Sequence, residues 1–360
     1  MNFQKPQKFH LCLAGITLAA IFLVAALAFA GEDGRSVFVL TSTNNSNGND
    51  VVVFKLNTGA GPSVSWLDTL STGGKGGAST NAGILQFRDD LGAVANWGSN
   101  TVSQLVRDHD SISIGPTIKL GTGCVNPDSV ALAQDHLYVV DTVCAESFRW
   151  PWGNTPDGTV PLGDTSAAQI AVGKTWAAVT LSDGKLYQLP LAGDGALSGT
   201  YTPITLLSGA SLVPLGEAFW GNVLGFTPAH DTDNFAIVNN GVEQPVPFPN
   251  PPGPYPANAP CWVAKGGGNI WYTGNSPGHA ISIFFSDSQG GAYYKSIPLP
   301  GPPSDITVSR DFKWLAVIYT YLGEGYIAVY SIDAYGDLTY VATSTSSALP
   351  TTISGVAFSE

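Results

Sequence analysis

The stretch S304-D-I-T-V-S-R-D-F-K-W-L-A-V-I-Y319, continued after a short loop by Y326-I-A-V-Y-S-I-D-A-Y-G-D-L-T-Y-V-A342, decides the fold. It holds four runs of apolar and β-branched residues, at 305–309, 314–320, 326–332 and 338–342, separated by polar turns. Four such runs joined by tight turns predict one antiparallel sheet of about 40 to 45 residues, the size of a β-propeller blade. A single sheet of this kind leaves both faces exposed, so further copies must stack against it.

The same pattern recurs along the chain. Innermost strands are expected at a spacing of about 45 residues, near Ile84, Val130, Ile170, Gly225, Trp262, Ile306 and Val356. We therefore predict an all-β fold, a seven-bladed propeller of four-stranded antiparallel blades.

The two ends of the chain complement each other. The last residues, Ile353–Phe358, read as an innermost strand, whereas the first blade begins at Ser36–Ser42 without one. We expect the C-terminal strand to join the N-terminal blade and close the ring, because this pairs both free strand edges.

Residues 1–30 have the features of an export signal: Lys5 and Lys8, an apolar run from Leu11 to Leu27, and Ala28-Phe29-Ala30. The apolar run is short for a membrane-spanning helix, although an uncleaved anchor remains the alternative. The expected mature chain, 31–360, is a single propeller domain without a membrane segment, secreted or periplasmic.

The net charge limits the classes of binding partner, and the number of cysteines bears on the cellular compartment. The formal net charge of −12 disfavours nucleic acid and anionic membranes. Three cysteines follow the signal, and in an oxidising compartment one pair and one free thiol are expected. Cys124 and Cys144 lie in connections of the third blade at the same face and are the expected disulfide, which leaves Cys261 as a buried thiol.

The repeats resemble those of the lactonase-like, or YVTN-type, seven-bladed propellers. The matching motifs are N96-W-G-S-N-T-V102, N269-I-W-Y-T-G-N275 and D305-I-T-V-S-R-D311, and the resemblance covers about Arg35 to Glu360. That family includes enzymes that hydrolyse a phosphorylated sugar lactone or form a lactone, and secreted members without assigned chemistry. Its enzymes have a histidine at the start of an inner strand, where this chain has Asn126-Pro-Asp-Ser129 and Pro303-Ser-Asp305.

Propellers generally bind ligands on the face formed by the connections between second and third strands and between blades, here called the loop face. His279 is the histidine expected there, and a general base would need an acid partner such as Glu217 or Glu146. His230, Asp231 and Asp233 are expected in a turn on the opposite face. We predict no metal site and no cofactor. Asn44–Asp50 has too few carboxylates for calcium and reads as a loop.

Candidate ligand-binding residues are charged or aromatic side chains expected on the loop face: Lys75, Asp141, Arg149, Trp150, Trp152, Trp220 and Glu324. The indoles could stack on sugar rings, although packing between blades is the plainer interpretation for the segment 148–152. Lys75 lies in a glycine-rich connection that lacks the P-loop pattern. Pro245–Pro260 reads as an extended connector between blades five and six.

The sequence favours a monomeric binding or scaffold protein that holds a small molecule, glycan or protein on the loop face. The alternative is a hydrolase or cyclase acting on a lactone or related small molecule. A phosphorylated substrate is not expected, because few cations are predicted on that face.

Overall fold

The computed structural model describes residues 35–78, 82–133, 135–151, 153–207, 213–229, 235–246, 259–287, 290–344 and 349–360. All strands belong to the compact unit Ser36–Glu360. The predicted export signal, residues 1–30, lies outside the described residues and stays a prediction. No helix in the described ranges has the length and apolarity needed to cross a membrane.

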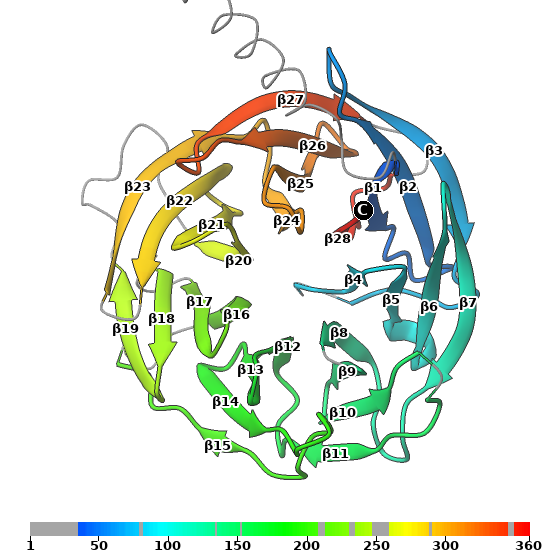
Figure 1. Ribbon diagram of the computed structural model, residues 1–360. Helices are drawn as coiled ribbons and strands as arrows, with labels where there is room; N and C mark the ends of the chain where they lie inside the picture. Colours follow the sequence, from blue (N-terminus) through cyan, green and yellow to red (C-terminus); the bar gives the residue numbers. More distant parts are fainter. Residues whose placement is uncertain are drawn as a thin grey trace, which may run out of the picture. The chain divides into compact units, whose positions relative to one another are not determined.

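Seven four-stranded antiparallel sheets stand around a central axis (Figure 1), so the predicted seven-bladed propeller is confirmed. Blades one to three consist of β28 (Ser354–Ser359), β1 (Val37–Ser42), β2 (Asp50–Asn57) and β3 (Ser63–Ser71); β4 (Leu85–Arg88), β5 (Leu91–Asn96), β6 (Thr101–Asp108) and β7 (Ser111–Lys119); and β8 (Pro127–Ala133), β9 (His136–Asp141), β10 (Cys144–Arg149) and β11 (Gly158–Pro161). Blades four and five consist of β12 (Ala167–Val172), β13 (Trp176–Leu181), β14 (Lys185–Pro190) and β15 (Thr202–Pro203); and β16 (Val213–Trp220), β17 (Val223–Ala229), β18 (Phe235–Asn239) and β19 (Val242–Val246). Blades six and seven consist of β20 (Pro260–Lys265), β21 (Ile270–Asn275), β22 (Ala280–Asp287) and β23 (Gly290–Pro298); and β24 (Pro303–Val308), β25 (Trp314–Tyr321), β26 (Glu324–Ile332) and β27 (Leu338–Ser344). One short 3₁₀ helix, η1, spans Trp97–Ser99.

The C-terminal strand closes the ring as expected. Strand β28 pairs antiparallel with β1, with Phe38 opposite Ser359 and Leu40 opposite Ala357. Figure 1 shows β28 next to the axis, followed outward by β1, β2 and β3. The first blade therefore consists of the last strand of the chain and the first three.

The blade topology defines two faces of the unit. The loop face carries the connections between second and third strands, such as 276–279, and the connections between blades, such as 299–302. The opposite face, called the turn face, carries the connections between first and second strands and between third and fourth strands, such as 309–313 and 333–337. A residue's position along its strand therefore determines which face it approaches.

Six of the seven innermost strands have an irregularity in pairing near the end at the loop face. In β8 the register skips Asp128, in β24 it skips Ser304, and in β28 it skips Gly355. The strands β12, β16 and β20 have the same interruption. Each such bulge bends its strand and turns one residue out of the ladder.

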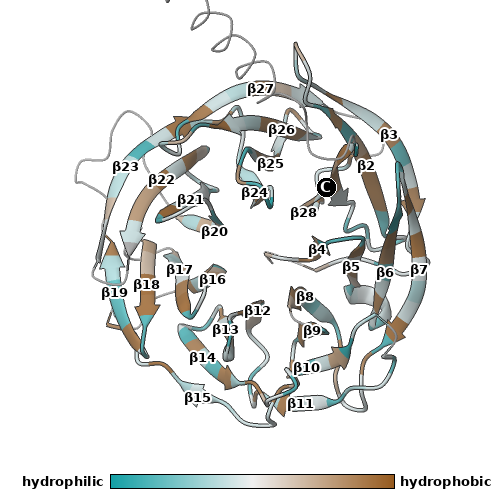
Figure 2. Cartoon of the chain, in the orientation of Figure 1, coloured by the Kyte–Doolittle hydropathy of each residue, from teal (hydrophilic) through white to brown (hydrophobic). Residues whose placement is uncertain are grey.

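The core lies between neighbouring blades. Strand β2 is buried at five of its first seven residues, and β22 packs Ile281, Ile283 and Phe284 inside. Figure 2 shows both strands largely in brown, whereas the outermost β23 is mixed. Tyr138 donates a hydrogen bond to the carbonyl of Gly195 at 2.6 Å, and Tyr272 donates to Gly336 at 2.9 Å. Each of these buried hydroxyls thus joins a second strand to the next blade.

Blade five differs from the prediction. The segment expected to be its innermost strand, around Gly225, is the second strand β17, and β16 is the innermost. The prediction for His230, Asp231 and Asp233 concerns residues outside the described part of the chain. Residues 247–258 of the proline-rich connector also lie outside it.

The predicted disulfide is present. Cys124 and Cys144 are bonded with their Cα atoms 5.6 Å apart, within the reach of a disulfide. Cys261 is a buried free thiol, also as predicted.

Candidate functional site

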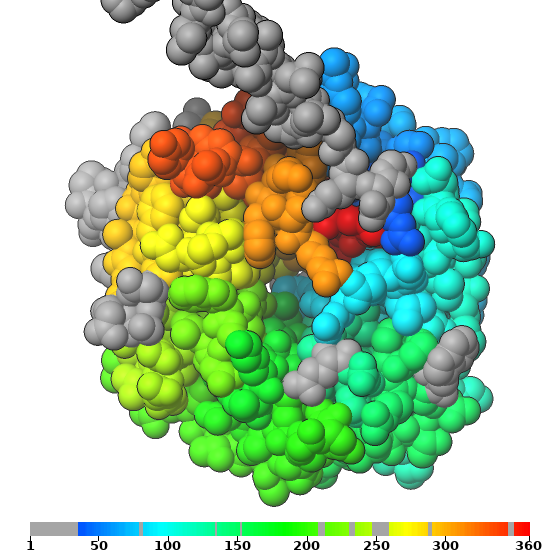
Figure 3. Space-filling view, in the orientation of Figure 1, coloured from blue at the N-terminus to red at the C-terminus, as the bar shows by residue number. Residues whose placement is uncertain are grey.

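A central channel of about 520 Å³ runs along the axis and opens at the turn face. Figure 3 shows the molecule hollowed at the centre of the ring. The channel is lined by residues of the innermost strands and of two adjoining turns, among them Gly83, Gln86, Phe87, Arg88, Asp89, Gln169, Glu217, Phe219, Lys265, Asp305, Thr307, Arg310, Phe358 and Glu360.

A second cavity of about 510 Å³ lies on the loop face, between blades one, six and seven. We call it the loop-face recess. Its described lining consists of amide, hydroxyl, proline and aliphatic side chains together with one indole: Asn44, Asn45, Ser46, Gly77, Ala78, Trp262, Ser276, Pro302, Pro303, Ser304, Thr320, Pro350, Thr351, Thr352, Ile353 and Ser354. None of these side chains carries a charge or titrates near neutral pH.

Part of the recess wall is rigid. Asn44 adopts a left-handed backbone conformation with φ of 48° and donates from Nδ2 to the carbonyl of Ala78 at 2.7 Å. Its Oδ1 accepts from the N–H groups of Gly77 and Ala78. A side chain on Gly76 would strike the Asn44 backbone, so this close approach requires glycine. These contacts join the connection between β1 and β2 to the segment that follows β3.

Ser304 supplies a polar group without a partner at the recess. It is the bulged residue of β24, and its buried Oγ makes no hydrogen bond with the described part of the chain. A buried hydroxyl in this state costs free energy. A ligand hydroxyl or carbonyl in the recess would satisfy it.

Two buried carboxyl groups, those of Glu217 and Asp305, line the channel next to the bulges of β16 and β24. Burial raises the pKa of Glu217 well above its usual value, and neither of its oxygens accepts a hydrogen bond of normal geometry from the part of the chain that the structure describes. Burial also raises the pKa of Asp305, to about 7, although its oxygens accept from the N–H groups of Ile306 and Val356. Both groups are embedded in strands, so they belong to the architecture of the ring.

The mouth of the channel at the turn face is where cations gather. Lys265 donates to the carbonyls of Gly266, Gly268 and Ile270, and its ammonium lies 5.3 Å from the ring centroid of Trp220. Burial lowers the pKa of Lys265 to about 8. Arg310 forms an ion pair with Asp89 across the mouth. Neither Lys265 nor Arg310 was among the residues predicted for a site.

The structure separates the predicted catalytic residues. His279 is an exposed residue of a loop-face turn, with φ of 47°, and does not line the recess. Glu217 is buried in β16. Glu146 is buried in β10, where its carboxylate accepts from the N–H of Gly121 at 3.0 Å and holds a connection between blades. None of the three hydrogen-bonds to another.

The predicted ligand-binding residues divide between the two faces. Lys75 and Glu324 are exposed on the loop face, and Asp141 is buried at its edge. Arg149 and Trp220 are the last paired residues of β10 and β16, and Trp150 follows Arg149. All three adjoin turn-face connections, so they lie on the face opposite to the one predicted. The reason is that 144–149 forms a regular third strand, β10, which ends at the turn face, and that Trp220 ends β16, the innermost strand of blade five. Trp152 lies outside the described residues.

Comparisons with known proteins identify the fold. No protein-family model and no curated protein sequence matches the chain. Among solved structures, a candidate 6-phosphogluconolactonase from Bacteroides uniformis superposes with a TM-score of 0.66 at 14% identity, covering 90% of this chain and 99% of that one. A protein from Lactobacillus plantarum gives a TM-score of 0.66 at 15% identity, covering 91% and 100%. A streptogramin B lyase gives 0.58 at 18% identity, covering 78% and 87%. At these identities the likeness establishes a common fold.

Proposed function

We propose that this protein is an exported binding protein that holds a neutral polar ligand, such as a sugar unit of a glycan, in the loop-face recess. The observation that carries the proposal is the lining of the recess, which offers hydroxyls, amides and one indole and no titratable side chain among the described residues. Sites that bind small ligands are typically concave, with a few placed polar groups in a largely uncharged wall.

The composition of the recess favours binding over acid–base catalysis. General acid–base catalysis needs a titratable group within hydrogen-bond reach of the reacting atom. Of the candidates, His279 does not line the recess, and Glu217 and Asp305 line the channel on the other side of the bulges.

The same lining favours a neutral ligand over an anion. A phosphate or carboxylate is normally held by arginine, lysine or a helix N-terminus, and the described wall has none of them. Trp262 and the prolines provide apolar surface for a ring, while Ser304 and Asn45 provide hydrogen-bonding groups. A sugar ring or a neutral lactone has both an apolar ring surface and oxygen atoms that form hydrogen bonds.

Export through the N-terminal signal is part of the proposal. The Cys124–Cys144 disulfide supports it, because disulfides persist mainly in oxidising compartments. Secretion or a periplasmic location would present the recess to glycans or envelope components. We propose that the protein acts as a monomer.

The test is a binding screen with the purified protein. A panel of neutral saccharides, neutral lactones and, for comparison, anionic sugar phosphates is titrated by calorimetry, and each compound that binds is incubated to measure turnover. The proposal expects saturable binding of at least one neutral saccharide, without chemical conversion. Binding confined to anionic compounds would refute it.

An enzyme acting on a neutral lactone is the second candidate. It is favoured by the fold shared with a candidate 6-phosphogluconolactonase and a streptogramin B lyase. On this alternative His279 supplies the base, and turnover of a lactone in the panel would fall in the His279→Ala variant. His109→Ala, which removes an exposed histidine on the turn face, is the matched control.

A further inference from the structure

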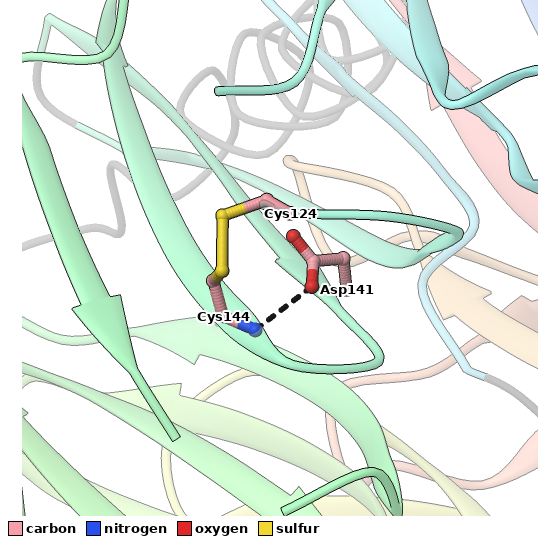
Figure 4. Close-up of side chains that lie close together, drawn as sticks. All are labelled: Cys124, Asp141 and Cys144. Carbon is pink, nitrogen blue, oxygen red and sulfur yellow. Dashed lines mark hydrogen bonds between the residues drawn. A yellow bond between two sulfur atoms is a disulfide. The ribbon is translucent and has the colours of Figure 1, made fainter. Parts of the chain in front are cut away.

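Three potential metal ligands meet in blade three, apart from the recess and the channel. The sulfur atoms of Cys124 and Cys144 and a carboxylate oxygen of Asp141 all lie within 4.8 Å of one another. Figure 4 shows the Asp141 carboxylate directed toward the disulfide. All three residues are buried.

The chain holds Asp141 in this position through one of its two oxygens. Oδ1 accepts from the N–H groups of Val143 and Cys144, both at 2.8 Å, in the short connection between β9 and β10. Oδ2 is buried and accepts no hydrogen bond of normal geometry from the described residues. A fully buried carboxylate oxygen without a partner is costly, so its presence beside two sulfurs points to a ligand.

We propose that reduction of the Cys124–Cys144 disulfide creates a Zn²⁺ site formed by the two thiolates and Asp141. In the oxidised protein the sulfurs are bonded to each other and cannot act as thiolates. The metal can therefore bind only after the disulfide has been reduced.

The reductant is a dithiol. It transfers two electrons and two protons to the protein disulfide, which becomes two cysteine thiols, while the dithiol becomes a disulfide itself. Zn²⁺ then displaces the two thiol protons and forms two Zn–S bonds and one Zn–O bond. Water takes the fourth position that tetrahedral zinc requires.

The donor set selects the metal. Two thiolates and one carboxylate suit zinc and other borderline or soft ions, whereas Ca²⁺ and Mg²⁺ require mostly oxygen ligands. The two cysteines are buried, with exposed fractions of 5% and 7%, whereas the neighbouring Val125 is 37% exposed. We expect a reductant and an ion to reach the site through local opening of the connection that carries Cys124 and Val125.

The experiment compares the oxidised and reduced forms of the purified protein. The reduced form is prepared with a dithiol, which is removed by anaerobic gel filtration, and each form is titrated with Zn²⁺ and with Ca²⁺. We expect one equivalent of Zn²⁺ to bind the reduced form, with no binding to the oxidised form and none of Ca²⁺ to either. Co²⁺ in place of Zn²⁺ should give a thiolate-to-metal charge-transfer band.

Two variants separate this site from adventitious binding. Asp141→Asn keeps the disulfide and should weaken Zn²⁺ binding to the reduced form at least tenfold. Asp164→Asn, an acid on the same face that pairs with Lys185, should leave it unchanged. Equal Zn²⁺ binding by the oxidised and reduced forms, or an Asp141→Asn variant with unchanged affinity, would overturn the proposal. Near-ultraviolet circular dichroism of the reduced form verifies that the fold is retained, and loss of the native spectrum on reduction would also overturn it.

Discussion

The side-chain amide of Gln169 in β12 hydrogen-bonds to both backbone groups of Glu217 in β16. Oε1 accepts from the Glu217 N–H at 2.7 Å, and Nε2 donates to the Glu217 carbonyl at 3.1 Å. The amide thus substitutes for a β-bridge between the innermost strands of blades four and five. Ser129 has a similar role one blade earlier, where its Oγ accepts from the N–H of Ile170 at 3.3 Å.

Replacing Gln169 by alanine should destabilise the protein. The change leaves the backbone groups of Glu217 without these two buried partners, at a cost of about 1–3 kcal/mol for each unsatisfied group. Urea unfolding of Gln169→Ala measures the loss. Gln188→Ala, at a half-buried position of the same blade, is the control and should lose much less. Equal losses of stability in the two variants would show that the hydrogen bonds between Gln169 and Glu217 make no special contribution.

Deleting residues 354–360 should prevent normal folding. The deletion removes β28, so β1 becomes an unpaired edge at the axis and an exposed edge strand promotes association. Size-exclusion chromatography should show aggregates or no soluble protein. Glu360→Gln leaves β28 intact and changes only the residue that follows it, so this variant should stay monomeric. A monomeric truncated protein with a native circular dichroism spectrum would contradict ring closure by β28.

Stability should decrease as pH rises from about 5 to 8, partly because of Glu217. Its pKa in the folded state lies well above the value of about 4.3 for a free glutamate. The stabilisation from a raised acid pKa is complete below the unfolded-state value and is lost as pH rises through the folded-state value. The free energy of unfolding of Glu217→Gln minus that of wild type should therefore be larger at pH 8 than at pH 5. Glu324→Gln, at an exposed position, should show no such pH dependence. If the difference between Glu217→Gln and wild type does not change with pH, the pKa of Glu217 is not raised in the folded state.

The protein should not hydrolyse 6-phosphogluconolactone efficiently. The phosphate and the developing oxyanion both need preorganised cations or donors, whereas the described wall of the loop-face recess has no cation. We expect kcat/KM below about 10⁴ M⁻¹s⁻¹, the low end for ordinary enzymes. Steady-state kinetics with the purified protein measures it, and a higher value would show that a phosphorylated substrate is accepted elsewhere, for example at the channel mouth beside Lys265 and Arg310.

Repeated features were predictable from the sequence, and features peculiar to one blade were not. The strand pattern of 304–342 and the complementary ends of the chain predicted the blades and their closure. Blade five was misassigned because V213-P-L-G-E-A-F-W220 contains proline, glycine and glutamate, which are uncommon in strands. Pro214 was the available signal, since Pro127, Pro260 and Pro303 also stand near the start of innermost strands.

The site was harder to predict than the fold. Which face a side chain reaches depends on the exact ends of its strand, and the sequence did not reveal that a third strand ends at Arg149, so Arg149 and Trp150 were predicted on the wrong face. The recess is formed largely by backbone, proline and small polar residues such as Ser304 and Thr351. No pattern of charged or catalytic residue types marks such a wall in the sequence.

The most direct test of the account is to block the loop-face recess and the channel separately and to measure binding of the saccharide identified in the screen. Thr351→Arg places a long cation in the loop-face recess, Thr307→Arg places one in the channel, and Thr339→Arg places one on the outermost strand β27 as a control. If the ligand occupies the loop-face recess, calorimetry should show at least tenfold weaker binding for Thr351→Arg and unchanged binding for the other two. Full affinity in Thr351→Arg, with loss in Thr307→Arg, would contradict it.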